Sequence, residues 1–478
     1  MAILPNFEPY VLTPLDHIAF PIHMSCFFTF HVDELSTAIP VLQAGVNRLV
    51  ELLPFLAGNV TLSTRLQGKK NVYEMQPSSA EFLQKHPMLK IKHHGEAVSP
   101  KTPGVSFSYD TLFNENWIPM SLDMVSEELA PMLRLQANIM QDGIILCYNF
   151  HHRAMDGIAV ENVMKDLAKC CKGPSLSAES LRTNPYKEAQ SRGVIRDAGN
   201  GHGTPSELHC LPAPIASLSS PLVSRMLKFD VAKIQHLREE CNSLLRQRLN
   251  SQGVDLSRNE TVSALIWLSL VRSRYGVPSS EGAGLNPKTK PEISTALIIS
   301  QIRNVLQPNL PDSYIGNAMV FSEARANIES MLSSFDLSAA QISPSSPLDP
   351  DKIKLLAELA LSIHNDFQKT TDEFARSTIS STSNNSDWSA LYHIGDMFIS
   401  NIRSLKMYEL DFGSILGKVQ NFDVPDIRIP GLAWLMPARF RDKFAPWEVR
   451  ISLEADVMER FQEDSLIKWV KSNQGYKL

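Results

Sequence analysis

The sequence lacks a long hydrophobic run. No uninterrupted apolar segment in its 478 residues approaches the roughly 20 that a membrane-spanning helix requires. The first ten residues, MAILPNFEPY, have no basic stretch followed by an apolar core, so they do not resemble a secretory signal. We therefore expect a soluble, cytoplasmic protein that does not bind membranes.

Cysteine is scarce, and its spacing suits neither metal binding nor redox chemistry. The six cysteines include no C-x-x-C pair, which excludes zinc ribbons and thioredoxin-like motifs. His93, His94 and Glu96 stand close together, but adjacent histidines in a strand point to opposite faces and have no further partner in register. We expect no metal ion and no permanently bound cofactor.

Clusters of basic residues are also missing. The net charge is −5, and no stretch gathers the lysines and arginines that a phosphate backbone would need, so nucleic acid is excluded as a partner. With 43% apolar and 20% charged residues, the composition is that of an ordinary globular protein. A local basic pocket for one anionic cosubstrate remains compatible with this charge.

The length predicts two large domains or three small ones, since a typical domain has about 150 residues. From Pro185 to Pro221 the chain loses its periodicity and becomes rich in Gly, Ser, Pro and His, which indicates a long linker. We expect an N-terminal domain over residues 1–200 and a C-terminal domain over residues 201–478. Segments starting at Gly276 and Ile342 have the composition of surface loops.

Helical and strand patterns alternate in both halves, which predicts an α/β fold. Apolar residues at three-to-four spacing predict helices over 35–53 and 352–376, and a third helix capped by Asp230. Alternating or β-branched residues predict strands over 105–109, 133–140 and 449–453.

One segment, HHRAMDG, carries the chemistry. The preceding run GIILCYNF (Gly143 to Phe150) has the length of a strand buried on both faces, and apolar residues recur at helical spacing after Gly157. His152 therefore lies in a turn between a buried strand and a helix, where functional side chains gather. Asp156 can cap the helix, and Gly157 would allow a tight reversal of the backbone. A chain of this length contains about one H-x-x-x-D by chance, so a core histidine without function is the alternative.

The motif HHRAMDG is similar to the HHxxxDG signature of the BAHD acyltransferase superfamily. Other segments resemble the superfamily's landmarks in the same order along nearly the whole chain, and the long loops and MPAR are closer to its fungal branch, which includes trichothecene acetyltransferases. The segments that carry the resemblance are LTPLD, LLPFLAG, PMLRLQA, NETVSALIW, QIRNVLQPNLPDSYIGN and DFG.

The resemblance implies two chloramphenicol-acetyltransferase-like α/β domains with a central channel, which coenzyme A and the acceptor enter from opposite faces. His152 would be the general base, since its unperturbed pKa of about 6.5 lies near working pH. It would take the acceptor's proton and return it to the thiolate, without a covalent enzyme intermediate.

The family also assigns roles to other positions. His152 and Asp156 form the catalytic motif, but the Asp156 carboxylate should point away from the acceptor and pair with Arg303. Asp411, Phe412 and Gly413 match a structural DFG motif, although DFGSILG replaces the usual DFGWG. Counting back from Asp411, Ser400 becomes the candidate oxyanion donor, and an ordinary structural serine is the alternative. Together with Gly157, Arg303 and the DFG residues should support the site structurally.

These features predict an acyl-CoA-dependent O-acyltransferase, with acetyl as the default donor group, acting on a hydroxylated specialised metabolite. The expected partners are acyl-CoA and a small-molecule acceptor, and the expected state is a monomer. Two alternatives stay open: acyl transfer from a carrier-protein thioester, and a non-acylating binding or pericyclic scaffold on the same fold.

Overall fold

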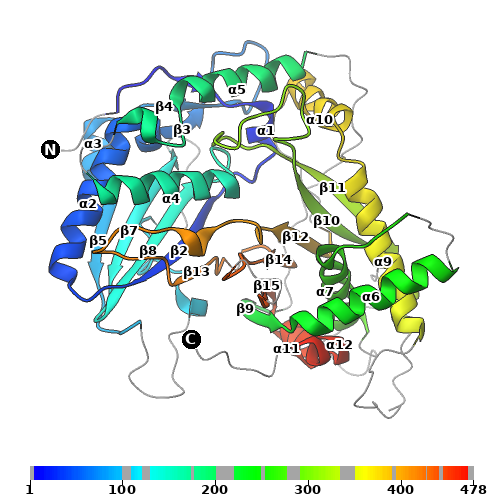
Figure 1. Ribbon diagram of the computed structural model, residues 1–478. Helices are drawn as coiled ribbons and strands as arrows, with labels where there is room; N and C mark the ends of the chain where they lie inside the picture. The colour runs from blue at the N-terminus through cyan, green and yellow to red at the C-terminus, as the bar shows by residue number, and fades with distance from the viewer. Residues whose placement is uncertain are drawn as a thin grey trace.

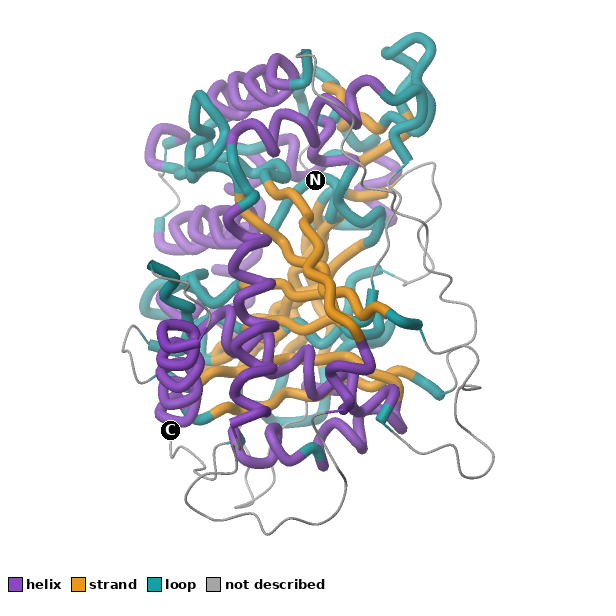
Figure 2. The backbone as a smooth tube through the Cα atoms, turned by 90° about the vertical axis from the view of Figure 1, so that its right-hand side faces the viewer, coloured by secondary structure: helices purple, strands orange, loops and turns teal. Residues whose placement is uncertain are grey.

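A computed structural model describes most of the chain (Figure 1). The described residues are 5–98, 109–120, 130–173, 177–200, 220–248, 253–276, 291–333, 350–389, 395–426, 428–440 and 445–471. Seen from the side, strands run through the centre of the molecule and most helices lie at its periphery (Figure 2).

The first large sheet has five strands in the order β13–β2–β8–β7–β5. They are β13 (Asn421–Asp423), β2 (His23–His31), β8 (Gly143–His151), β7 (Leu133–Ile139) and β5 (Leu89–His93). Helices α2 (Leu35–Leu52) and α4 (Gly157–Lys172) lie together over this sheet (Figure 1). Their apolar faces and the strands form one continuous hydrophobic core, whose burial is the main stabilising contribution.

The second large sheet has six strands in the order β11–β10–β12–β14–β15–β9. They are β11 (Met319–Asn327), β10 (Ile293–Gln301), β12 (Met397–Asn401), β14 (Leu432–Leu435), β15 (Trp447–Glu454) and β9 (Leu222–Phe229). A separate core joins this sheet to α6 (Val231–Arg248), α7 (Arg258–Tyr275), α9 (Pro350–Gln368) and α11 (Ala455–Glu463). Helix α7 is buried along most of its length, and a capping box between Ser257 and Glu260 fixes its start.

A small third sheet and short helices complete the fold. The sheet runs β1 (Tyr10–Val11), β4 (Tyr73–Gln76), β3 (Asn59–Leu62) and β6 (Ala130–Pro131). The remaining α-helices are α1 (Pro14–His17), α3 (Ala80–Lys85), α5 (Pro185–Ala198), α8 (Ile328–Ser333), α10 (Asp372–Asn384) and α12 (Ser465–Val470). Single 3₁₀ turns are η1 (Pro54–Ala57), η2 (Tyr109–Thr111), η3 (Ala178–Ser180) and η5 (Met407–Glu409).

The structure confirms the α/β class and most of the predicted elements. The helices predicted over 35–53 and after Asp230 are α2 and α6, and the strands over 133–140 and 449–453 are β7 and β15. The prediction of a single helix over 352–376 is wrong, because α9 ends at Gln368 and a second helix, α10, starts at Asp372. Thr371 caps the second helix by accepting a hydrogen bond from the Phe374 N–H. The strand predicted over 105–109 lies outside the described residues except for Tyr109, which is in η2.

The linker predicted from Pro185 is wrong in its first part, because residues 185–198 form helix α5. Asn184 caps this helix and Pro185 occupies its first turn. Two of its buried residues, Glu188 and Ser191, are polar, which hides the helical periodicity in the sequence. The rest of the predicted linker, residues 201–219, and most of the two predicted loops lie outside the described residues.

The expected domain division at residue 200 therefore stays a prediction. One described strand crosses it, since β13 from the C-terminal part pairs with β2 of the first sheet. None of the described helices is both long enough and apolar enough to cross a bilayer.

Candidate active site

His152 follows the central strand β8 and lies in the turn that leads into α4. All nine residues of β8 are buried, so the strand is a rigid support for this turn. The backbone of His152 is held on both sides: its N–H donates to the Ile22 carbonyl at 2.9 Å, and its carbonyl accepts from Asn317 Nδ2 at 2.8 Å. The backbone that carries the imidazole is thus held by contacts from both parts of the chain.

The geometry of the imidazole suits a base. His152 Nδ1 lies 3.2 Å from the Met155 carbonyl oxygen. Because a carbonyl only accepts, Nδ1 carries the proton and Nε2 keeps the basic lone pair of the neutral ring. Burial lowers the pKa of His152, and the nearby Asp156 carboxylate opposes this shift. The ring is therefore neutral and able to accept a proton at pH 7.

The first histidine of the pair has a different environment. His151 is buried, and its ring packs edge-on against His23 with 5.0 Å between ring centroids. Burial lowers the pKa of His151 well below its ordinary value. His152, and not His151, is among the described residues that line the cavity at this turn, so the second position is available for chemistry there.

This cavity lies where the two large sheets meet. Its walls include Met24 on β2, Phe150 on β8, Ile299 on β10 and Ser400 on β12, in addition to His152. Its water-accessible volume is about 100 Å³. Strands of both large sheets thus supply its walls, and space exists beside the imidazole for reacting groups.

Asp156 is paired and buried rather than free. Its carboxylate receives Arg303 Nη1 at 2.7 Å and Nη2 at 3.0 Å, and both side chains are at most 2% exposed. It also accepts from the Ala159 N–H at 3.0 Å, as a helix cap, and from the Ala318 N–H at 3.2 Å. The structure confirms the predicted ion pair, and the engaged oxygens leave Asp156 little capacity to exchange protons with a substrate.

Arg303 extends this contact to the segment that follows it. Its Nη2 donates to the carbonyls of Tyr314 at 2.9 Å and Gly316 at 3.1 Å, and its Nη1 donates to Gln301 Oε1 at 2.5 Å. One guanidinium therefore ties residues 301–316 to the start of α4. This is a positioning arrangement, since a fixed planar fork orients several groups at once.

Two residues that the sequence did not single out complete the support of His152. Asp16 Oδ1 accepts from the Asn317 backbone N–H at 2.9 Å and from Asn317 Nδ2 at 3.1 Å. The same Nδ2 also donates to the His152 carbonyl. Asp16 ends the segment LTPLD, and Asn317 ends QIRNVLQPNLPDSYIGN. Their position at the ends of two family segments was the only feature of the sequence that could have indicated a role at the site.

Ser400 and Gly157 both line the cavity. Ser400 is 6% exposed and sits opposite Trp434 in the parallel pairing of β12 and β14. Gly157 is the first residue of α4, and its φ does not lie in the positive range, so its backbone conformation does not itself require glycine. A Cβ there would lie 3.5 Å from Ile402 and Leu405, an ordinary contact, so the glycine mainly leaves the cavity wider.

The DFG residues lie outside this cavity. Asp411 pairs with Lys172 at the end of α4 at 3.0 Å and accepts from the Gly413 N–H at 3.0 Å. Gly413 has a φ of 93°, which favours glycine, and Phe412 is buried edge-on against Phe30. These contacts attach the C-terminal part of the chain to α4 and β2.

The described residues contain no group of three or more His, Cys, Asp and Glu side chains that could hold a metal ion. Of the two adjacent histidines at the end of β5, His94 stacks on Trp117 with 3.9 Å between ring centroids, and its Nε2 lies 2.9 Å from Asn138 Oδ1. Its surroundings are those of a packed side chain.

Comparison with known proteins identifies the family. Residues 106–466 match the model of the Transferase family, and residues 22–171 match the trichothecene 3-O-acetyltransferase-like N-terminal domain. The chain is 32% identical to the communesin N16 acyltransferase of Penicillium expansum, over 97% of this chain and 98% of that protein. It is 28% identical to an O-acetyltransferase of Neosartorya fischeri, over 98% of both.

Solved structures share the fold. The TRI101 protein of F. graminearum, in complex with coenzyme A and deoxynivalenol, has a TM-score of 0.72 at 17% identity, covering 97% of this chain and 99% of that one. Vinorine synthase has a TM-score of 0.64 at 17% identity, covering 99% and 97%. The chain therefore belongs to the Transferase family, with the two-domain BAHD fold, and is an acyltransferase.

Proposed function

We propose that the enzyme transfers an acetyl group from acetyl-CoA to a hydroxyl of a fungal secondary metabolite, with His152 as the general base. One observation carries this proposal: a neutral imidazole, fixed through Nδ1, lines a cavity between the two large sheets. Most of the relatives are named O-acetyltransferases, which supports transfer of an acetyl group to oxygen. One relative is named an N16 acyltransferase, which points to a nitrogen acceptor in that protein.

The proposed reaction uses these residues in order. His152 Nε2 takes the proton from the acceptor hydroxyl while the oxygen attacks the thioester carbonyl. Ser400 supports the developing oxyanion from the opposite sheet. The carbon–sulfur bond then breaks, and the imidazolium returns its proton to the thiolate, which yields the ester and free CoA. Donor and acceptor are bound together, and no covalent enzyme intermediate forms.

The test compares purified parent enzyme with His152→Ala, using acetyl-CoA and a panel of hydroxylated terpenoids, alkaloids and polyketides with amine analogues included. We expect the parent to release free CoA and acetylated product, and the variant to lose about 10²- to 10⁴-fold in rate. His93→Ala, an exposed histidine at the end of β5, is the matched control and should retain full turnover. Undiminished turnover in His152→Ala would remove the base assignment.

The same proposal includes a cytoplasmic monomer with domains over residues 1–200 and 201–478. The described cysteines are all unpaired, which agrees with a reducing compartment. Size-exclusion chromatography with light scattering tests the monomer, and limited proteolysis between residues 200 and 220 tests the division.

A further inference from the structure

The cavity beside His152 offers few polar groups to a substrate. Among the described residues, its only lining carboxylate, Asp156, is paired with Arg303, and no lysine or arginine lines it. The lining side chains that carry an amide or a hydroxyl are Gln301, Ser400, Asn401 and Ser404. Neutral hydrogen bonds, rather than charges, must therefore orient the reactants in this cavity.

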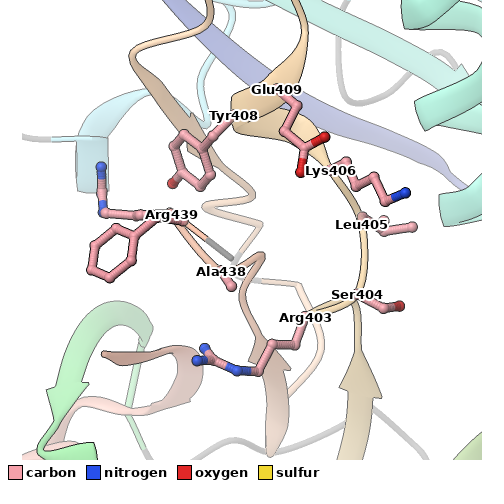
Figure 3. A pocket seen from close by; sticks show the side chains of 9 residues that line it. Arg403, Ser404, Leu405, Lys406, Tyr408, Glu409, Ala438 and Arg439 are labelled. Carbon is pink, nitrogen blue, oxygen red and sulfur yellow. The ribbon is translucent and has the colours of Figure 1, made fainter. Parts of the chain in front are cut away.

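Two of these polar residues belong to the segment that leaves β12. Asn401 Oδ1 accepts from the Arg403 N–H at 3.0 Å, and Ser404 follows directly. Figure 3 shows Arg403 and Ser404 on the stretch of chain that curves around a neighbouring pocket of about 490 Å³. Gln301 is not among the described residues that line that pocket. It is exposed at the end of β10, so its side chain lies where the His152 cavity meets solvent.

The amide of Gln301 is held in one orientation. Arg303 Nη1 donates to Gln301 Oε1 at 2.5 Å. Because a guanidinium only donates, the amide atom beside it must be the oxygen, and the NH₂ group takes the other position. Its Nε2 lies 3.5 Å from Asp156 Oδ2, at the outer limit of a hydrogen bond. At least one N–H of the amide therefore remains for a ligand in the cavity.

The chemistry of the two reactants decides which of them this N–H meets. Next to the reacting carbon, the acetyl group has only a methyl group and the carbonyl oxygen, for which Ser400 is the proposed donor. The acceptor gives its hydroxyl proton to His152 and has further substituents that need orienting. An N–H binds a lone pair, so it suits a second oxygen of the acceptor. In a cavity of about 100 Å³ this oxygen must lie close to the reacting hydroxyl.

We propose that Gln301 recognises, through its Nε2 N–H, a carbonyl or ether oxygen on the carbon next to the hydroxyl that is acetylated, and so determines which hydroxyl reaches His152. The inference rests on the proposed function, because it needs a hydroxyl acceptor and His152 as the base. Arg303 acquires a second role, since it keeps the amide oxygen turned away from the substrate. An ammonium group at the same place would meet only a donor, so the site disfavours it.

Three full-length variants separate recognition of the acceptor from support of Arg303, and all are assayed at pH 8. Gln301→Met has a similar length and no amide. Gln301→Glu keeps an oxygen that can accept from Arg303 but has no N–H. Gln67→Met, an exposed glutamine in the turn after β3, is the matched control.

The probes are pairs of alcohols that differ in the neighbouring oxygen, added to the panel of acceptors. One pair is trans-2-methoxycyclohexanol and trans-2-ethylcyclohexanol, which have nearly the same shape, and the other is 16-oxoestradiol and estradiol. The parent enzyme should favour the oxygenated member about tenfold in kcat/KM, as expected for one hydrogen bond. Both Gln301 variants should lose this preference, with little change for the other member or in KM for acetyl-CoA. Gln67→Met should keep it.

Three results would overturn the inference: no preference in the parent, equal losses for both members of a pair in Gln301→Met, or a preference restored in Gln301→Glu. The last two are the pattern of a residue that only supports Arg303. Turnover confined to panel compounds without a neighbouring oxygen would also overturn it. In all these cases acetylation still occurs and the proposed function stands, whereas a parent enzyme that acetylates no hydroxyl compound would refute both.

Discussion

Asp16 accepts two hydrogen bonds from Asn317, a residue 301 positions away in the chain. Since Asn317 Nδ2 also donates to the His152 carbonyl, this contact links the N-terminal turn, the strand β11 region and the candidate base. Burial raises the pKa of Asp16, and the hydrogen bonds from Asn317 and Thr13 oppose that shift. The donors of Asn317 thus help to keep a buried carboxyl group satisfied next to the active site.

Replacement of Asn317 by Leu should therefore reduce both stability and activity. The change removes the side-chain donor to the His152 carbonyl and one of the two donors to Asp16 Oδ1, which keeps its bond from the backbone N–H of residue 317. Loss of a partner of a buried polar group costs about 1 to 3 kcal/mol. Urea denaturation measures the free energy of unfolding, and kcat should fall while KM for acetyl-CoA is unchanged. Asn47→Leu, on the exposed face of α2, is the control. A variant with full stability and full kcat would contradict the linking role.

Because Asp156 and Arg303 form an ion pair, we expect the effects of replacing each of them on the unfolding free energy not to add. Arg303→Met alone leaves the buried Asp156 carboxylate without its partner, which should cost about 3 to 5 kcal/mol in unfolding free energy. Asp156→Asn retains an oxygen to cap α4, so adding it to Arg303→Met removes the unpaired charge and should recover part of the loss. Denaturant unfolding of both single variants and the double variant completes the cycle. Additive losses would show that the two side chains do not interact.

The sequence predicts much of this site because its strongest signals are local. The run GIILCYNF and the periodicity after Gly157 locate His152 between β8 and α4, and the family resemblance supplies Arg303 as the partner of Asp156. The contact of Asn317 with Asp16 joins distant segments, and no local pattern contains it. Helix α5 was missed because polar residues such as Glu188 face the core, and the three-residue strand β13 is too short for a periodic signal.

The pH dependence of turnover should report the environment of the half-buried His152 imidazole. Burial lowers the pKa of His152, so the ring stays neutral at pH values where an exposed histidine would be protonated. The acid limb of kcat/KM should therefore lie below pH 6.5, measured with an acceptor that does not ionise in this range. Because the Asp156 charge raises the pKa of His152, Asp156→Asn should move the limb to still lower pH. A limb above 6.5 in the parent enzyme would contradict this environment.

Glu188 predicts a different pH effect, on stability. Burial raises the pKa of Glu188 to about 8, while Arg192 and the Ile315 N–H oppose the shift. The folded state binds this proton more tightly than the unfolded chain, whose carboxyl has a pKa near 4.3. The resulting stability is fully present below about pH 4.3 and is lost as pH rises through 8.

Glu188→Gln removes this titration and keeps an oxygen that can accept from the Ile315 N–H. Relative to the parent enzyme, the variant should gain unfolding free energy between pH 6 and pH 9, measured by denaturant titration at each pH. Glu81→Gln, an exposed residue on α3, should show no such gain. A constant difference between Glu188→Gln and the parent across this range would contradict the raised pKa.

Ser400 decides whether the second sheet takes part in the chemistry or only forms a wall. Ser400 lies on β12 of the second sheet and lines the same cavity as His152, which follows β8 of the first sheet. If the hydroxyl donates to the oxyanion, Ser400→Ala should lower kcat by about 10²- to 10³-fold, with KM for acetyl-CoA nearly unchanged, since the bond strengthens only in the transition state. Ser400→Thr keeps a hydroxyl and should restore most of the rate, whereas Ser400→Val fills the same volume without a donor and should not. Single-turnover kinetics of the three variants make the comparison, and similar rates for Thr and Val would assign Ser400 to packing alone.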